Sequence, residues 1–172
     1  MRRASFLLVC AAMLAPALVG EVKLRHLNLR YLEAGAFKRI SEYFTGRENP
    51  GSRLLCRSRP ASRAGLYLIL SLSERSRNLP EGATFLLEVI RPDSPEPKTF
   101  RIPVPAERPR GKEAYVGLTG EDWPDPEARP VAWRLRLLDS AGATLFDRKS
   151  FLWEKRPAPV APKAEPSSVS IP

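Results

Sequence analysis

Short runs of alternating apolar and polar side chains constrain this chain more than any other feature. In the clearest run, leucine occupies every second position, at Leu66, Leu68, Leu70 and Leu72, and Tyr, Ile and Ser stand between them. A period of two places every second side chain on the same face of a β-strand. The run therefore predicts a strand, and its strongly apolar face predicts a central position in a sheet.

Further runs of the same period follow along the chain. Three of them place apolar residues on one face: Leu27, Leu29 and Tyr31; Phe85, Leu87 and Val89; Phe100, Ile102 and Val104. A fourth includes Val131, Trp133, Leu135 and Leu137. Shorter strands are expected at 54–57 and 115–118, and a last strand at 144–153, after a turn at 139–142. Because Pro103 and Pro105 cannot donate to a sheet, the run through Ile102 is expected at an edge after a loop over 93–97.

Residues 37–45 break this pattern. Phe37, Ile40 and Phe44 have helical spacing, and Gly46 could cap a helix at its C-terminus. We expect either a short helix or an irregular aromatic segment that covers one end of the core.

These elements predict an all-β domain over residues 21–154. About seven strands with turns between them are typical of an antiparallel β-sandwich of immunoglobulin-like or fibronectin-type pattern. A small barrel is the alternative. The disulfide of true immunoglobulin domains is missing, since Cys56 is the only cysteine expected to remain after export.

The two ends have different compositions. Arg2 and Arg3 precede an uncharged stretch from Ala4 to Gly20, which predicts a signal peptide over residues 1–20. An uncleaved anchor, lipidation at Cys10 and twin-arginine export are the alternatives. Residues 155–172 are rich in proline and predict a disordered tail. The chain is therefore expected to be secreted or periplasmic in a bacterium, with membrane contact only through the signal peptide before cleavage.

No catalytic or metal motif accompanies this design. His26 is the only histidine, which argues against a multi-histidine metal site, and no serine lies in a Gly-x-Ser-x-Gly elbow. Cys56 is expected to be a buried apolar residue rather than a nucleophile paired with His26. We therefore expect no cofactor and no enzymatic activity. An enzyme of unrecognised type, using Glu121, Asp122 or Asp125, remains an alternative.

Charge and aromatic residues suggest binding. The chain carries a formal net charge of +9. Four arginines fall close together and form a candidate anion-binding loop: Arg53, Arg57, Arg59 and Arg63. Trp123 is a candidate aromatic contact, and Tyr43 and Phe44 could serve the same purpose if they are exposed.

We therefore expect an exported, non-catalytic module that serves protein interaction or assembly, with an unidentified envelope protein as its partner. An open strand edge could provide the contact. Binding of an anionic glycan or another anionic polymer through the arginine loop is the alternative function. Nucleic acid is not an expected partner.

Overall fold

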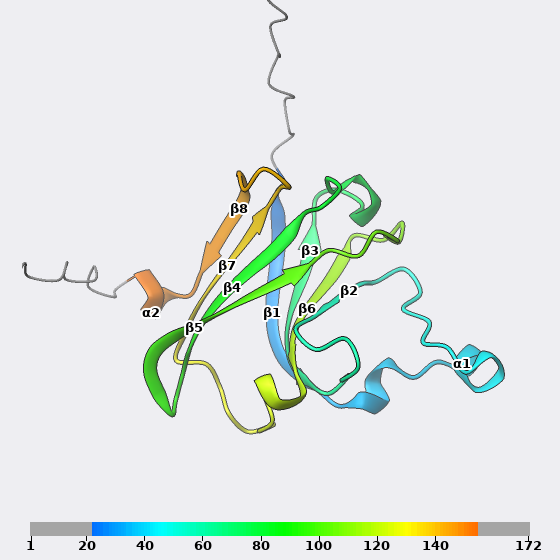
Figure 1. The fold of residues 1–172 in the computed structure, drawn as a ribbon, viewed down its shortest axis with the longest axis horizontal. Helices are drawn as coiled ribbons and strands as arrows, with labels where there is room; N and C mark the ends of the chain where they lie inside the picture. Colours follow the sequence, from blue (N-terminus) through cyan, green and yellow to red (C-terminus); the bar gives the residue numbers. More distant parts are fainter. Residues whose placement is uncertain (1–21, 155–172) are drawn as a thin grey trace, which may run out of the picture.

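Two four-stranded sheets face each other in the computed structural model, which describes residues 22–154 (Figure 1). The first sheet contains β1 (Leu24–Leu32), β2 (Leu54–Arg57), β3 (Gly65–Leu72) and β6 (Glu113–Thr119). The second contains β4 (Thr84–Arg91), β5 (Ser94–Pro103), β7 (Ala132–Leu138) and β8 (Thr144–Lys149). Helical turns are short: η1 (Ala34–Phe37), α1 (Ile40–Thr45), η2 (Ser76–Asn78), η3 (Gly120–Asp122) and α2 (Phe151–Glu154). The fold is all-β, as predicted.

The first sheet has the order β1-β3-β6-β2. The strand over residues 65–72 lies inside it, between β1 and β6, which confirms the predicted central position. The register of β1 shifts between Leu24 and His26. Strand β2 pairs with β6 in parallel, so the prediction of a wholly antiparallel sandwich is wrong for this pair. The parallel pair arises because the chain leaves β1, adds β2 at the far edge beside β6, and only then returns to form β3.

The second sheet has the order β5-β4-β7-β8 and is antiparallel throughout. Strand β5 is an edge strand, as its prolines predicted. The turn between β7 and β8 is held by Asp139, whose side chain accepts hydrogen bonds from the backbone N–H groups of Ala141 and Ala143 at 2.9 and 2.8 Å. This hairpin occupies the predicted turn.

The main core fills the space between the sheets. All four leucines of the clearest alternating run are buried there, at 1% exposure or less. The apolar faces of the other runs meet them: Phe85, Leu87, Val89, Phe100, Ile102, Leu135 and Leu137. Trp133 is half-buried against the same core. The predicted alternation therefore identified the inner faces of both sheets.

A second, smaller core lies on the other side of the first sheet, where Phe37, Tyr67 and Tyr115 are buried together. The ring centres of Phe37 and Tyr67 are 5.0 Å apart. The predicted short helix is present as α1, and Gly46 caps it with a left-handed φ of 64°. Of the aromatic residues in this segment only Phe37 covers a core, because α1 itself projects into solvent (Figure 1).

Two predicted boundaries are wrong. Strand β5 begins at Ser94, so the expected loop over 93–97 is largely a strand, and Pro95 and Pro97 belong to its edge. Strand β8 ends at Lys149, and Trp153 lies in α2 instead of a strand. The predicted signal peptide and the predicted proline-rich tail lie outside the described residues. Within residues 22–154 no helix has the length and apolar character needed to cross a membrane.

Candidate functional site

The arginine cluster consists of four residues in or next to β2: Arg53, Arg57, Arg59 and Arg63. Arg57 donates from Nη1 and Nη2 to the two carboxylate oxygens of Glu48 at 2.7 and 2.6 Å. Its Nε donates to the hydroxyl of Tyr67 at 2.9 Å, and its guanidinium lies 4.8 Å from the ring centre of Phe37. The Arg57 side chain is 6% exposed, so its charge is neutralised inside the protein.

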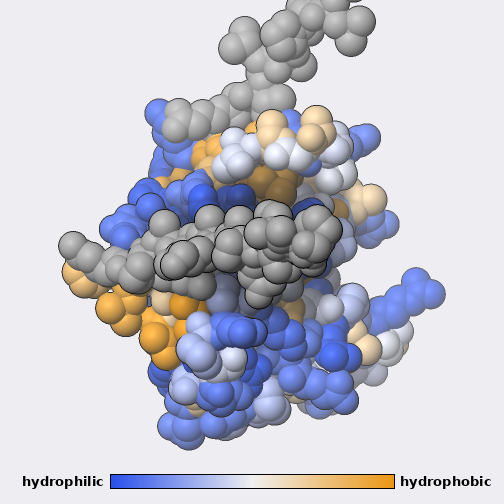
Figure 2. Space-filling model, turned by 60° about the vertical axis from the view of Figure 1, so that its left-hand side comes forward, coloured by the Kyte–Doolittle hydropathy of each residue, from blue (hydrophilic) through white to orange (hydrophobic). Residues whose placement is uncertain are grey.

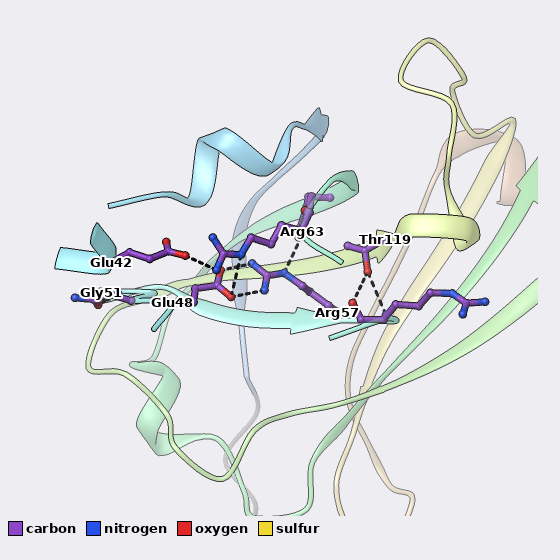
Figure 3. A network of polar contacts seen from close by, with 9 residues as sticks. Glu42, Glu48, Gly51, Arg57, Arg63 and Thr119 are labelled. Carbon is purple, nitrogen blue, oxygen red and sulfur yellow. Dashed lines mark hydrogen bonds and ion pairs between the residues drawn. The ribbon is translucent and has the colours of Figure 1, made fainter. Parts of the chain in front are cut away.

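Arg63 approaches the same carboxylate from the loop after β2. Its Nε lies 3.7 Å from Glu48, and its Nη2 lies 2.5 Å from Glu42 in α1. Figure 3 shows Arg57 and Arg63 converging on Glu48. The hydrogen bond from Arg57 lowers the pKa of Glu48 below its usual value, despite the opposing effect of burial. The two arginines therefore hold the segment that carries α1 against the first sheet.

The other two arginines are also paired with carboxylates. Arg59 lies 3.1 Å from Glu121 and 3.4 Å from Asp122, both in η3. The loop at Arg59 is fixed further by Thr119, whose hydroxyl donates to the Arg59 carbonyl at 2.9 Å and accepts from its N–H at 3.1 Å. Arg53 makes a longer contact, 3.9 Å, with Glu113. Each arginine of the cluster thus has a carboxylate beside it.

This pairing changes the interpretation of the cluster. Five carboxylates face the four arginines: Glu42, Glu48, Glu113, Glu121 and Asp122. An anionic ligand would have to displace these internal partners, and the desolvated pairs with Arg57 and Arg63 would be costly to break. The cluster acts first as a structural network that joins α1, β2 and η3.

Trp123 is 1% exposed and belongs to the main core. The guanidinium of Arg91 lies 4.9 Å from its ring centre. Trp123 therefore offers no aromatic surface to a ligand, which corrects the sequence-based interpretation. The physical reason is that η3 turns the chain back over the end of the sandwich and carries the indole inward. Tyr43 and Phe44, in contrast, are 80% and 85% exposed.

The residues considered for catalysis are not assembled into a site. His26 lies in β1 and Cys56 in β2, at opposite edges of the first sheet. Burial raises the pKa of the Cys56 thiol to about 12. Glu121 and Asp122 both pair with Arg59, and Asp125 accepts a hydrogen bond from the N–H of Glu127. Among residues 22–154 no group of three or more metal-ligating side chains is close enough to hold an ion.

The sheet edges provide a different kind of site, and three of the four are blunted. Directly after β5, the Val104 N–H donates to the Ala83 carbonyl, so by alternation Pro97 and Pro103 occupy positions that face outward. Proline has no N–H to offer a partner there. Strand β2 has only four residues. In β8 the outward backbone groups belong to two charged residues, Asp147 and Lys149.

Strand β1 is the exception. It has nine residues and no proline. Along β3 the backbone groups point alternately to β6 and to β1. At its end the Leu72 N–H donates to the carbonyl of Lys112, just before β6, and the next N–H, that of Ser73, donates to the carbonyl of Lys23, just before β1. Leu27, Leu29 and Tyr31 pair with the residues of β3 whose backbone groups point to β6. Their own N–H and C=O groups therefore point away from β3. No other described strand pairs with them.

The side chains along this edge add an apolar surface. Leu27, Leu29 and Tyr31 are only partly buried, although they pack against the main core. A groove of about 290 Å³ separates β1 from the β7–β8 hairpin, and its lining is Leu24, Arg25, His26, Leu27, Trp133 and Arg148. Figure 2 shows the side of the molecule that carries β8 and α2, where apolar patches alternate with hydrophilic surface. No carboxylate lines the groove, so its rim is cationic.

The opposite side of the sandwich has a larger hollow, about 430 Å³, between β2 and β5. Four prolines line it: Pro50, Pro60, Pro103 and Pro105. It lacks an open run of backbone donors and acceptors, because one of its strands is short and the other is blocked by proline. The edge of β1 is therefore the better candidate. The sequence contained little signal for it: residues 24–32 lack proline, but so do strands such as β3, β4 and β7.

Comparisons with known proteins do not assign the chain to a family. No family model, curated protein sequence or solved structure matches the chain.

Proposed function

We propose that this chain is an exported, non-catalytic β-sandwich module that binds a partner protein by accepting one of its strands at the edge of β1. The observation that carries the proposal is the row of outward backbone groups at Leu27, Leu29 and Tyr31. A strand added to such a row gains main-chain hydrogen bonds without requiring special side chains. The three blunted edges would limit pairing to this one.

The groove beside β1 specifies the chemistry of the partner. A strand added to β1 would place alternate side chains over the partly buried Leu27 and Leu29 and toward Trp133. Apolar residues at every second position would complete the core there. Arg25 and Arg148 on the rim favour acidic residues beside the apolar ones. The expected ligand is therefore an alternating apolar strand with acidic flanks.

We also propose a fibronectin-type arrangement for the sandwich. Without β2, the sheets read β1-β3-β6 and β5-β4-β7-β8. With the strands lettered A, B, C, C′, E, F and G in chain order, these are A-B-E and C′-C-F-G, the arrangement that the fibronectin type would have. Strand β2 is then an insertion between A and B that takes the place beside E. In many sandwiches of this class the first strand is an edge, which agrees with a docking role for β1.

The expected location, secreted or periplasmic in a bacterium, fits this function. Its support is the signal-peptide pattern over residues 1–20. A strand-accepting module in the envelope would meet its partner after both had crossed the inner membrane. Binding of an anionic polymer through the arginine cluster has less support, because each arginine already faces a carboxylate.

The test compares two substitutions at one position. Leu29→Pro removes the outward N–H together with the side chain, whereas Leu29→Ala removes the side chain and keeps the N–H. Because this N–H serves no strand within the sheet, both variants should fold. The tagged chain and both variants are used to capture proteins from envelope extract at low and high salt.

We expect the wild type and Leu29→Ala to retain the same protein at high salt, and Leu29→Pro to lose it. Amide hydrogen exchange at Leu27, Leu29 and Tyr31 should become slower in the complex. Equal capture by both variants, or equal loss, would exclude strand addition. Capture of only anionic polymers at low salt would favour the arginine cluster instead.

A further inference from the structure

Helix α1 presents three large apolar side chains to solvent. Ile40, Tyr43 and Phe44 are 78%, 80% and 85% exposed, the three highest values among the exposed large hydrophobic residues of the described chain. We call these three residues the α1 knob. Figure 1 shows α1 projecting sideways from the sandwich, away from both sheets. Scattered single apolar residues are ordinary at a surface, but three on one short helix mark an interaction site.

The knob is held in place by the polar network beneath it. Glu42, on the opposite side of α1, pairs with Arg63 at 2.5 Å. The Asn49 side chain donates to the Ser41 hydroxyl at 3.0 Å. Glu48, a few residues after the helix, is bound by Arg57. The carboxylates of the segment thus face the body of the protein, and the apolar side chains face away from it.

The charges around the knob have one sign. Lys38, Arg39 and Arg47 are exposed, and no ion pair within residues 22–154 involves them. The two acidic residues between Lys38 and Asn49, Glu42 and Glu48, are both bound to arginines. The surface around the knob is therefore cationic, with apolar residues at its centre.

We propose that the α1 knob inserts into the interfacial region of a lipid bilayer that contains anionic phospholipid. Tyr and Phe side chains suit the boundary between headgroups and acyl chains, and an apolar residue beside them adds buried area. The cations on either side would lie among the anionic headgroups. Because α1 projects from the sandwich (Figure 1), the knob needs a medium that can close around it, as a bilayer does. This contact is additional to the signal peptide and independent of β1.

The first experiment places an environment-sensitive fluorophore at the knob. The full chain carries Cys10→Ala and Phe44→Cys, and NBD is attached to the new thiol; Cys56 is buried and stays unlabelled. A matched chain carries the label at Ser140, in the turn between β7 and β8. Vesicles of phosphatidylcholine with phosphatidylglycerol are then added. We expect the fluorescence at position 44 to rise at least twofold and shift to the blue, and that at position 140 to stay unchanged.

The second experiment measures vesicle binding of unlabelled chains by co-sedimentation. Ile40→Ser with Phe44→Ser should raise the lipid concentration for half-binding at least tenfold, and Lys38→Glu with Arg47→Glu should do the same. The control, Lys98→Glu with Arg101→Glu, makes the same charge change on β5 and should have less than a threefold effect. All variants contain the same leader, so differences between them report on the substituted residues.

Three outcomes would overturn the proposal. The first is an equal or absent fluorescence change at positions 44 and 140. The second is an equal loss of binding in the knob and β5 charge variants, which would indicate general charge attraction. The third is vesicle binding that is unchanged by Ile40→Ser with Phe44→Ser. If the knob variants instead lose a soluble acidic protein and not vesicles, the knob is a protein contact.

Discussion

Arg57 and Glu48 form a two-bond ion pair that is largely withdrawn from solvent. The guanidinium donates at 2.7 and 2.6 Å to the two oxygens, and the side chains are 6% and 23% exposed. Tyr67 joins them, since its hydroxyl accepts from Arg57 and donates to the Arg63 carbonyl at 2.6 Å. The pair therefore links the loop before β2 to the second core and to the base of the α1 knob.

We expect Arg57→Ala to lower the free energy of unfolding by about 3 kcal/mol, because it leaves the Glu48 carboxylate partly buried without its donor. Arg53→Ala is the matched control. Its partner Glu113 lies 3.9 Å away, both side chains are exposed by more than a third, and the Arg53 guanidinium lies 5.3 Å from the ring centre of Tyr115, so we expect a loss of no more than about 1 kcal/mol. Urea unfolding followed by fluorescence measures both. Similar losses in the two variants would show that burial does not distinguish these arginines.

Acid should weaken the fold through Glu48. The hydrogen bond from Arg57 lowers its pKa in the folded state, so the unfolded chain binds this proton more readily. The resulting stabilisation is present above the ordinary value of 4.5 and is lost as the pH falls through the lower folded-state pKa. Asp147 behaves in the same way, because its hydrogen bond with Arg134 lowers its pKa from 3.8.

Glu48→Gln isolates this effect. The melting temperature of the wild type should exceed that of the variant at pH 7, and the difference should shrink as the pH falls below 4.5. Thermal unfolding at intervals between pH 7 and pH 2 provides the measurement. A difference that stays constant over this range would mean that the Glu48 charge does not contribute to stability.

The sequence predicted the strands well because their signal is local. A period of two is visible within each run, as at Leu66 to Leu72, and burial of one face follows from it. The edge position of β5 followed from the missing N–H groups of Pro103 and Pro105. The parallel placement of β2 could not be predicted, since four residues carry no information about which strand they join.

The site was harder to predict because it depends on partners that are distant in the sequence. Arg59 is clustered with Arg57 in the sequence, but Asp122, which pairs with it, is 63 residues away. The four arginines in the sequence therefore suggested an anion-binding site, whereas in the fold they form ion pairs with carboxylates of the same chain. Exposure of Phe44 and burial of Trp123 are likewise set by how each segment docks, not by residue type.

Gly117 of β6 lies opposite Tyr67 of β3, and the Tyr67 ring leaves no space for a side chain at position 117. A Cβ atom added at position 117 would lie 2.4 Å from Cε1 of the Tyr67 ring, which is completely buried and cannot move away. We expect Gly117→Ala to cost about 1 to 3 kcal/mol of stability. Gly35→Ala is the control, because no atom lies within 4 Å of its added Cβ and it should be close to neutral. Wild-type stability for Gly117→Ala would mean that the second core is more loosely packed than the structure indicates.

The reactivity of the Cys56 thiol tests whether the hollow between β2 and β5 opens to solvent. Cys56 contributes to the lining of that hollow, yet it is 1% exposed, and burial raises the pKa of its thiol to about 12. At pH 8 only about one thiol in ten thousand would be ionised, against about one in four for an ordinary cysteine. We expect maleimide labelling of Cys56 in the folded chain to be at least a hundredfold slower than in urea, with peptide mass mapping to separate it from Cys10. Labelling at the rate of an ordinary exposed thiol would instead show that β2 separates from β5 in solution, and this second edge would then have to be considered beside β1 as a place for a partner strand.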